Sequence, residues 1–157
     1  MLMMIVSMDA LQRLQATLHN QIPLSQTMGL AVGAYDNGCL TLHAPLKPNI
    51  NDKDTAFAGS LNALVTLTGW SLTWLVLDSA GLHGEIVIQD SSIQYLRPVT
   101  RDFVARSCLP EASDVNRFLT LLRRRGLARL ELQAEIHEAG VCAVSFSGRY
   151  VVQLRQS

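Results

Sequence analysis

Residues 49–61 read NINDKDTAFAGSL and place a cluster of polar side chains directly before the most apolar segment of the chain. Asn49 and Asn51 carry neutral amides that can donate hydrogen bonds. Gly59 and Ser60 stand where an apolar helix is expected to begin, and the first turn of a helix has N–H groups without intrahelical partners. Such donors can stabilise an oxygen that gains negative charge. The stretch predicts either an ordinary turn with a helix cap or a site for carbonyl chemistry.

The apolar segment that follows, residues 57–77, contains no charged side chain. Its length would suffice to cross a bilayer, which needs about 20 apolar residues. Polar side chains are nevertheless scattered through it: Ser60, Asn62, Thr66, Thr68, Ser71 and Thr73. A helix enclosed by its own protein tolerates this pattern, and both flanks have the alternation of soluble β structure. We therefore expect a buried central helix and no membrane contact.

The N-terminal part predicts one helix and one hairpin. Leu11, Leu14 and Leu18 recur at helical spacing, and Pro23 is expected to end this helix. The following segment alternates as two short strands around an Asp-Asn-Gly turn at residues 36–38. That turn type between apolar runs is a strong hairpin pattern.

The C-terminal part predicts four strands and a short helix. GEIVIQDSSIQYLRPV reads as a long strand that Pro98 ends, and DFVARSCL reads as the next strand. A short helix is expected from Ser113, with Gly126 just past its end, and two final strands join at residues 138–140. The order favours a single α+β domain over residues 1–157, in which an antiparallel sheet wraps the long apolar helix. Residues 1–8 are interpreted as a ragged start, that is, an irregular segment ahead of the true beginning of the domain near Met8.

Composition limits the function classes. The chain has 157 residues, 48% of them hydrophobic, with zero formal net charge and a pI of about 6.9, which argues against a nucleic-acid binder. Residues 91–157 nevertheless carry ten basic against six acidic side chains. Arg123, Arg124 and Arg125 stand in a row and suit phosphate or carboxylate partners, although a solvated basic turn explains them equally well.

The cysteines and histidines show no pattern of a metal site or redox motif. Cys39, Cys108 and Cys142 are odd in number and lack a C-x-x-C spacing, so we expect three reduced thiols in a reducing, cytoplasmic compartment. The N-terminus lacks the basic region of a secretory signal. The histidines have no metal-ligand spacing, so no metal is expected; they are His19, His43, His83 and His137.

Several motifs together resemble the hot-dog fold superfamily of acyl-thioester enzymes. NDKDTAFAGSL is similar to the loop and helix start of that fold, and IQYLRPVTRDFVARSCL to its third and fourth strands. Within the superfamily, the chain resembles the YiiD C-terminal, or thioesterase-like, branch. The shared motifs are PN-x-N, T-x-F-x-G-S and LTGW, here at residues 48–51, 55–60 and 67–70.

The resemblance implies an activity and partners. Members of this branch are labelled thioesterases, and some stand-alone members are malonyl-acyl-carrier-protein (malonyl-ACP) decarboxylases that supply acetyl primers for fatty acid synthesis. The substrate would arrive on the phosphopantetheine of ACP or on coenzyme A, with no further cofactor. The resemblance also implies a homodimer, with the thioester site near the interface of the two sheets.

The resemblance also assigns roles to residues of the opening stretch. Hot-dog thioesterases commonly carry a carboxylate about two turns into the central helix, and seven residues after Gly59 that position holds Thr66. Residues 55–77 contain no carboxylate at all, which favours decarboxylation or simple binding over hydrolysis, because neither needs a base, and the paired asparagines favour decarboxylation over binding. Asn51 is the predicted catalytic donor to the enolate. The predicted oxyanion or substrate-binding residues are Asn49, Thr55, Gly59, Ser60 and Thr66.

Two alternatives remain open at this point. The first is an acyl-CoA or acyl-ACP thioesterase, in which Asp52 or Asp54 would have to serve as the base. The second is a non-catalytic acyl-chain binder. In each case Arg123, Arg124 and Arg125 are candidates for contact with the carrier protein or with the phosphates of the arm.

Overall fold

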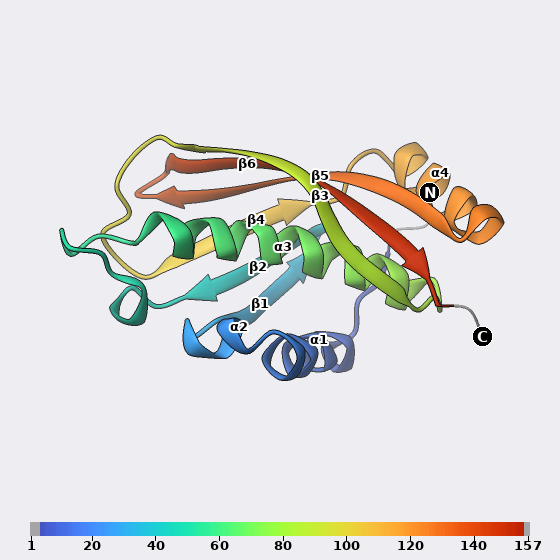
Figure 1. Cartoon of the computed structure of the whole chain (residues 1–157), viewed down its shortest axis with the longest axis horizontal. Coiled ribbons are helices and arrows are strands. Elements are labelled where there is room, and N and C mark those ends of the chain that lie inside the picture. The colour runs from blue at the N-terminus through green and yellow to red at the C-terminus, as the bar shows by residue number, and fades with distance from the viewer. Residues whose placement is uncertain (1–3, 156–157) are drawn as a thin grey trace.

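The computed structural model describes residues 4–155 (Figure 1), so part of the predicted ragged start, residues 1–3, lies outside the described residues. The helices are α1 (Met8–Gln21), α2 (Pro23–Thr27), a 3-10 turn (Lys47–Asn49), α3 (Ala58–Ser79) and α4 (Ala112–Arg125). The strands are β1 (Ala31–Asp36), β2 (Cys39–Ala44), β3 (Gly84–Tyr95), β4 (Phe103–Cys108), β5 (Leu127–Glu138) and β6 (Val141–Leu154).

The strands form one antiparallel sheet in the order β1-β2-β4-β5-β6-β3. β1 and β3 are therefore the two edges, although β3 follows β2 in the chain. The sheet curves around α3, and α1 and α2 lie beside β1 (Figure 1). In β5 every second residue is buried, as the alternation in the sequence predicts. The predicted α+β architecture, with an antiparallel sheet around a long apolar helix, is confirmed.

α3 is the core of the molecule. By length and composition alone it could span a membrane, but 67% of its most apolar window is buried inside the protein. Two of its buried hydroxyls are satisfied within the helix: Thr68 Oγ1 donates to the Leu64 carbonyl at 2.7 Å and Thr73 Oγ1 to the Gly69 carbonyl at 2.9 Å, whereas the buried Ser71 hydroxyl has no hydrogen-bond partner among the described residues. These bonds remove the cost of burying hydroxyl groups in an apolar core.

The predicted turns are confirmed by their backbone angles. Asn37 and Gly38 both have positive φ, 48° and 79°, as a two-residue turn between antiparallel strands requires. Ala139 and Gly140 do the same between β5 and β6, at 52° and 75°. Gly126 ends α4 in the left-handed conformation at φ 72°, where its N–H donates to the Leu122 carbonyl.

Pro23 has a different role from the one predicted. α1 ends at Gln21, and Pro23 begins α2, where a proline at the first helical position loses no intrahelical hydrogen bond. The chain therefore turns at Ile22 and continues as a second short helix.

The prediction of three reduced thiols is wrong for two of them. Cys39 on β2 and Cys108 on β4 are directly opposite one another, with Cα atoms 3.9 Å apart, and their sulfurs form a disulfide. The two cysteines are 69 residues apart in sequence, and only the strand register brings them together. Cys142 is a free thiol. Disulfides persist mainly in oxidising compartments, so the cysteines no longer support the expectation of a reducing compartment.

Candidate active site at the start of the central helix

The first turn of α3 presents unpaired backbone donors. Phe57 is the N-cap residue, and its side chain makes no capping hydrogen bond. The first intrahelical bond runs from the Leu61 N–H to the Phe57 carbonyl, so the N–H groups of residues 58–60 have no acceptor within the helix. A Cβ atom at Gly59 would collide with the Phe57 ring. Glycine therefore lets this half-exposed ring lie against the helix start.

The loop before α3 is fixed to the body of the protein. The Phe57 N–H donates to the Asn49 carbonyl at 2.7 Å. The Asn49 side chain is buried, and its amide donates to the carbonyls of Met28 (2.8 Å) and Pro45 (2.7 Å). Both amide hydrogens of Asn49 thus hold the loop in place, and its predicted contact with substrate stays a prediction.

Asn51 and Thr55 organise the tip of this loop. Asn51 Oδ1 accepts from the backbone N–H groups of Lys53 (2.8 Å) and Thr55 (3.2 Å). Asn51 Nδ2 donates to Thr55 Oγ1 at 2.9 Å and to the Ala56 carbonyl at 3.4 Å, so its predicted contact with substrate stays a prediction. Asp54 sits at φ 60° in the resulting turn, and the aspartates of the loop are exposed. The structure brings the predicted residues Asn51 and Thr55 together directly before the helix start.

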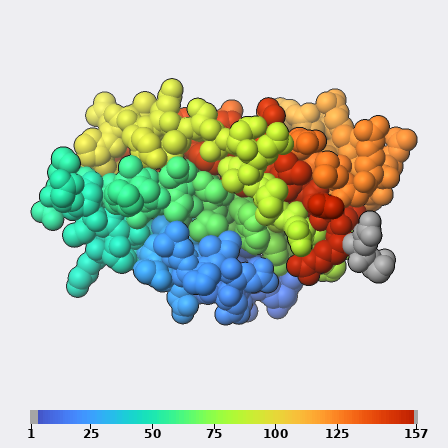
Figure 2. Space-filling model, in the orientation of Figure 1, coloured from blue at the N-terminus to red at the C-terminus, as the bar shows by residue number. Residues whose placement is uncertain are grey.

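One row of residues that winds along α3 is only half-buried. It is formed by residues four apart, all half-buried, which we call the α3 stripe: Asn62, Thr66, Trp70, Trp74 and Asp78. In Figure 2 this helix reaches the surface between α1 and β3. The Trp70 indole donates to the Ile86 carbonyl on β3 at 3.2 Å, which ties the stripe to the sheet edge.

The N-terminal half of the stripe offers two neutral polar groups. Thr66 Oγ1 donates to Asn62 Oδ1 at 3.1 Å. Among the residues that the structure describes, no acceptor is bonded to the Asn62 amide nitrogen. The Thr66 carbonyl accepts a 2.6 Å bond from the Tyr150 hydroxyl, and burial raises the pKa of Tyr150, so this hydroxyl stays protonated. Sequence reasoning missed Asn62; an amide and a hydroxyl four apart in an apolar run were the available indication.

The C-terminal end of the stripe is closed by α1. The Arg13 guanidinium makes two bonds to the Asp78 carboxylate, 2.6 and 3.0 Å long, and lies 5.6 Å from the centre of the Trp74 ring. Arg13 lowers the pKa of Asp78. Asp78 is the one carboxylate on α3, and it is neutralised at the helix end remote from Gly59. α3 therefore provides no free general base near its start.

The arginine cluster lies far from this site within one chain. Arg123, Arg124 and Arg125 form the exposed last turn of α4, where positive charge complements the helix dipole. Figure 1 places α4 at the end of the molecule opposite the start of α3. Their contact with a carrier stays a prediction.

Comparison with known proteins supports the thioester assignment. Residues 11–154 match the family described as "Putative thioesterase (yiiD_Cterm)". A crystal structure from Shewanella oneidensis with the same thioesterase description is 36% identical, covers 92% of this chain and 98% of its own, and superposes with a TM-score of 0.86. A protein of unknown function from Chlorobaculum tepidum is 30% identical over 92% and 94% of the two chains, with a TM-score of 0.87.

A more distant relative shares the fold. A thioesterase from Haemophilus influenzae is 16% identical, covers 99% of this chain and 98% of its own, and has a TM-score of 0.72. The antiparallel sheet around a long central helix and the match to a thioesterase family point to the same assignment. The chain belongs to the YiiD C-terminal thioesterase family and has the hot-dog fold.

Proposed function

We propose that this protein decarboxylates the malonyl thioester of acyl carrier protein to the acetyl thioester, which primes fatty acid synthesis. One observation carries the proposal: the start of α3 combines unpaired backbone donors with the neutral Asn62–Thr66 pair and has no carboxylate. A carboxylate at this place would repel both the malonyl group and the enolate formed from it.

The reaction needs an oxyanion site more than a base. The bond between the malonyl carboxylate carbon and the α-carbon breaks, carbon dioxide leaves, and the electron pair collects as an enolate on the thioester oxygen. In this proposal the N–H groups of Gly59 and Ser60 stabilise that oxygen, with Asn51 as the predicted side-chain donor. A proton from water, or through the hydroxyl of Ser60 or Thr66, then gives the acetyl thioester.

Hydrolysis is the second candidate, and the family description favours it. It needs an activated water. The nearest carboxylates in the chain, Asp52 and Asp54, are exposed on the loop before the helix, and Asp52 is already paired with Lys53 at 3.2 Å. A base from a partner subunit would be the other source.

We propose that the working form is a homodimer. β3 is an edge strand of 12 residues, and the apolar side chains of Val87 and Tyr95 on it and of Leu96 directly after it are about half exposed. Proteins normally pair or cover such an edge. Pairing of two β3 edges would cover these side chains and put a second subunit beside the α3 stripe. Light scattering at micromolar concentration should give twice the mass of one chain.

Mass spectrometry of the carrier tests the reaction. The protein is incubated with malonyl-ACP and, in parallel, with acetyl-ACP. Decarboxylation converts malonyl-ACP to acetyl-ACP with the acyl group still attached, and leaves acetyl-ACP unchanged. Free carrier thiol from both substrates would identify a hydrolase instead. Unchanged malonyl-ACP that nevertheless binds the protein would identify an acyl binder. The same pair of coenzyme A thioesters shows which carrier is preferred.

A further inference from the structure

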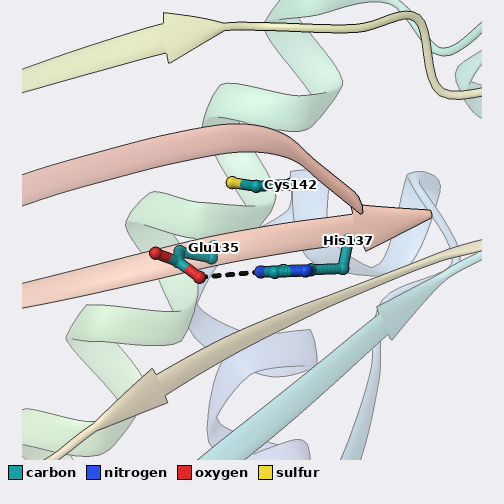
Figure 3. Close-up of side chains that lie close together, drawn as sticks. All are labelled: Glu135, His137 and Cys142. Carbon is teal, nitrogen blue, oxygen red and sulfur yellow. Dashed lines mark hydrogen bonds and ion pairs between the residues drawn. The ribbon is translucent and has the colours of Figure 1, made fainter. Parts of the chain in front are cut away.

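The hairpin between β5 and β6 gathers three different metal-ligating side chains, which we call the hairpin cluster: Glu135, His137 and Cys142 (Figure 3). His137 and Cys142 are directly opposite each other across the strand pair. Glu135 precedes His137 by two residues and so lies on the same face of β5. This register brings a carboxylate, an imidazole and a thiol to one place on the outer face of the sheet.

The distances within the hairpin cluster are close to those of a metal site. One ligand atom from each of the three side chains lies within 4.8 Å of the others, and His137 Nε2 is 2.7 Å from Glu135 Oε2. Ligands at zinc distances of about 2.0–2.3 Å, in a tetrahedron, are separated from one another by roughly 3.3–3.6 Å. Small side-chain rotations are enough to reach this arrangement, because two of the residues are exposed and Cys142 is half-buried.

We propose that Glu135, His137 and Cys142 bind a divalent cation of the zinc class, with the fourth coordination position open to water or a solute. Nitrogen, oxygen and sulfur donors together suit a borderline-soft cation and do not suit magnesium or calcium, which prefer oxygen alone. Three protein ligands and one open position form the arrangement of a reactive site rather than a closed structural one.

The surroundings favour a cation. Glu135 and His137 line a hollow of about 820 Å³ on the outer face, together with the carboxylates of Glu111, Asp114 and Glu131. Arg106 also lines it and stands opposite Glu135 on β4, but Glu135 makes its hydrogen bond with His137 instead. Glu131 is paired with Arg149 at 3.2 Å, which leaves three carboxylates facing one arginine, and a cleft with excess negative charge concentrates cations.

Binding has a definite proton balance. While no cation is present, the Cys142 thiol keeps its proton and donates it to the Val144 carbonyl at 3.4 Å. When the cation binds, the sulfur–hydrogen bond breaks, the sulfur keeps the electron pair as its bond to the metal, and the proton leaves to solvent. The Nε2–H bond of His137, which donates to Glu135 Oε2, breaks as well: its proton leaves to solvent, the Nε2 lone pair binds the metal, and the neutral ring takes up its one hydrogen at Nδ1 from solvent.

Cobalt(II) titration of the full chain tests the site without reference to activity. No reductant is added, so that the Cys39–Cys108 disulfide stays intact and Cys142 is the available thiol. Bound cobalt should give a thiolate-to-metal charge-transfer absorption in the near ultraviolet, and zinc should displace it and remove the absorption. Cys142→Ser should abolish the band. His137→Gln and Glu135→Gln should each weaken cobalt binding by more than about tenfold, since even indirect partners of a metal contribute this much.

His43→Gln is the matched control, because His43 is an exposed histidine on β2 outside the cluster, and it should keep both the band and the affinity. Circular dichroism confirms that each variant is folded. Cobalt binding without a thiolate band, a band that survives in Cys142→Ser, or unchanged affinity in both His137→Gln and Glu135→Gln would overturn the assignment.

Discussion

The two ends of the α3 stripe differ in chemistry although they belong to one row of half-buried residues along the helix. At the N-terminal end, Asn62 and Thr66 are neutral and lie near unpaired backbone donors. At the C-terminal end, Asp78 is negative and is bound by Arg13 from α1. Asn62 and Asp78 are 16 residues apart, which is about 24 Å along a helix.

The difference shows where this helix tolerates a charge. A half-buried carboxylate is stable where a guanidinium is held against it by two hydrogen bonds, as at Asp78. No such partner lies on α3 near its start, and the side chains there are uncharged. We infer that the N-terminal end serves chemistry and the C-terminal end serves stability. Substitutions at the first should change turnover, and substitutions at the second should change unfolding.

The largest effect is expected for Asn51→Ala beside the N-terminal end. Turnover of malonyl-ACP should fall about a hundredfold, the usual loss for one oxyanion donor. Asn62→Ala is the comparison on the stripe, and should cost about fivefold, the value of one ordinary hydrogen bond of roughly 1 kcal/mol. Single-turnover rates measure both. If Asn62→Ala has the larger effect, the side-chain donor is on the helix and not in the loop.

A charge at position 66 should have the next largest effect. Thr66→Asp places a carboxylate where the enolate and malonyl group would be, and decarboxylation should fall by at least about tenfold through repulsion. The asparagine of Thr66→Asn has nearly the same shape as the aspartate of Thr66→Asp but carries no charge, so this variant should keep most of the activity. Mass spectrometry of the carrier separates the products. Faster decarboxylation in Thr66→Asp than in Thr66→Asn would contradict the proposed chemistry.

At the C-terminal end, Arg13→Gln should lower the melting temperature and leave turnover unchanged. Arg13 lowers the pKa of Asp78 in the folded protein, so their pairing contributes stability above the unfolded pKa of about 4, and this contribution is lost as the pH falls through the folded value. The difference between wild type and variant should therefore be present at neutral pH and disappear in acid.

Lys53→Gln is the control for that experiment, because Lys53 and Asp52 form a fully solvated pair, with side chains 76% and 80% exposed. Such pairs contribute little to stability. A constant difference between Arg13→Gln and wild type across the acid range would show that Arg13 acts through its packing on Trp74 and not through Asp78.

The smallest effect is expected for Asp54→Asn. Asparagine adopts the left-handed conformation at least as readily as aspartate, so the backbone at φ 60° is undisturbed and the charge alone is removed. A decarboxylase should keep its turnover. Abolished activity in this variant, with Asn51→Ala nearly intact, would instead favour hydrolysis with Asp54 as the base.

The sequence by itself determined the elements, because their causes are local. Turn residues that tolerate positive φ marked both hairpins, and a glycine marked the end of α4. The alternation of apolar and polar residues predicted which face of β5 is buried, and the run without charged residues predicted the core helix α3. The sequence also shows that residues 55–77 contain no carboxylate, and this still supports the proposed decarboxylation.

Tertiary structure alone decided which of these residues meet. Strand order and register place Cys39 against Cys108 and the hairpin cluster on one face, although no short motif links their members. Arg13 reaches Asp78 across 65 residues and neutralises the one carboxylate of α3. Contacts between segments far apart in the chain depend on how the sheet closes around α3, and local propensity carries no information about that closure.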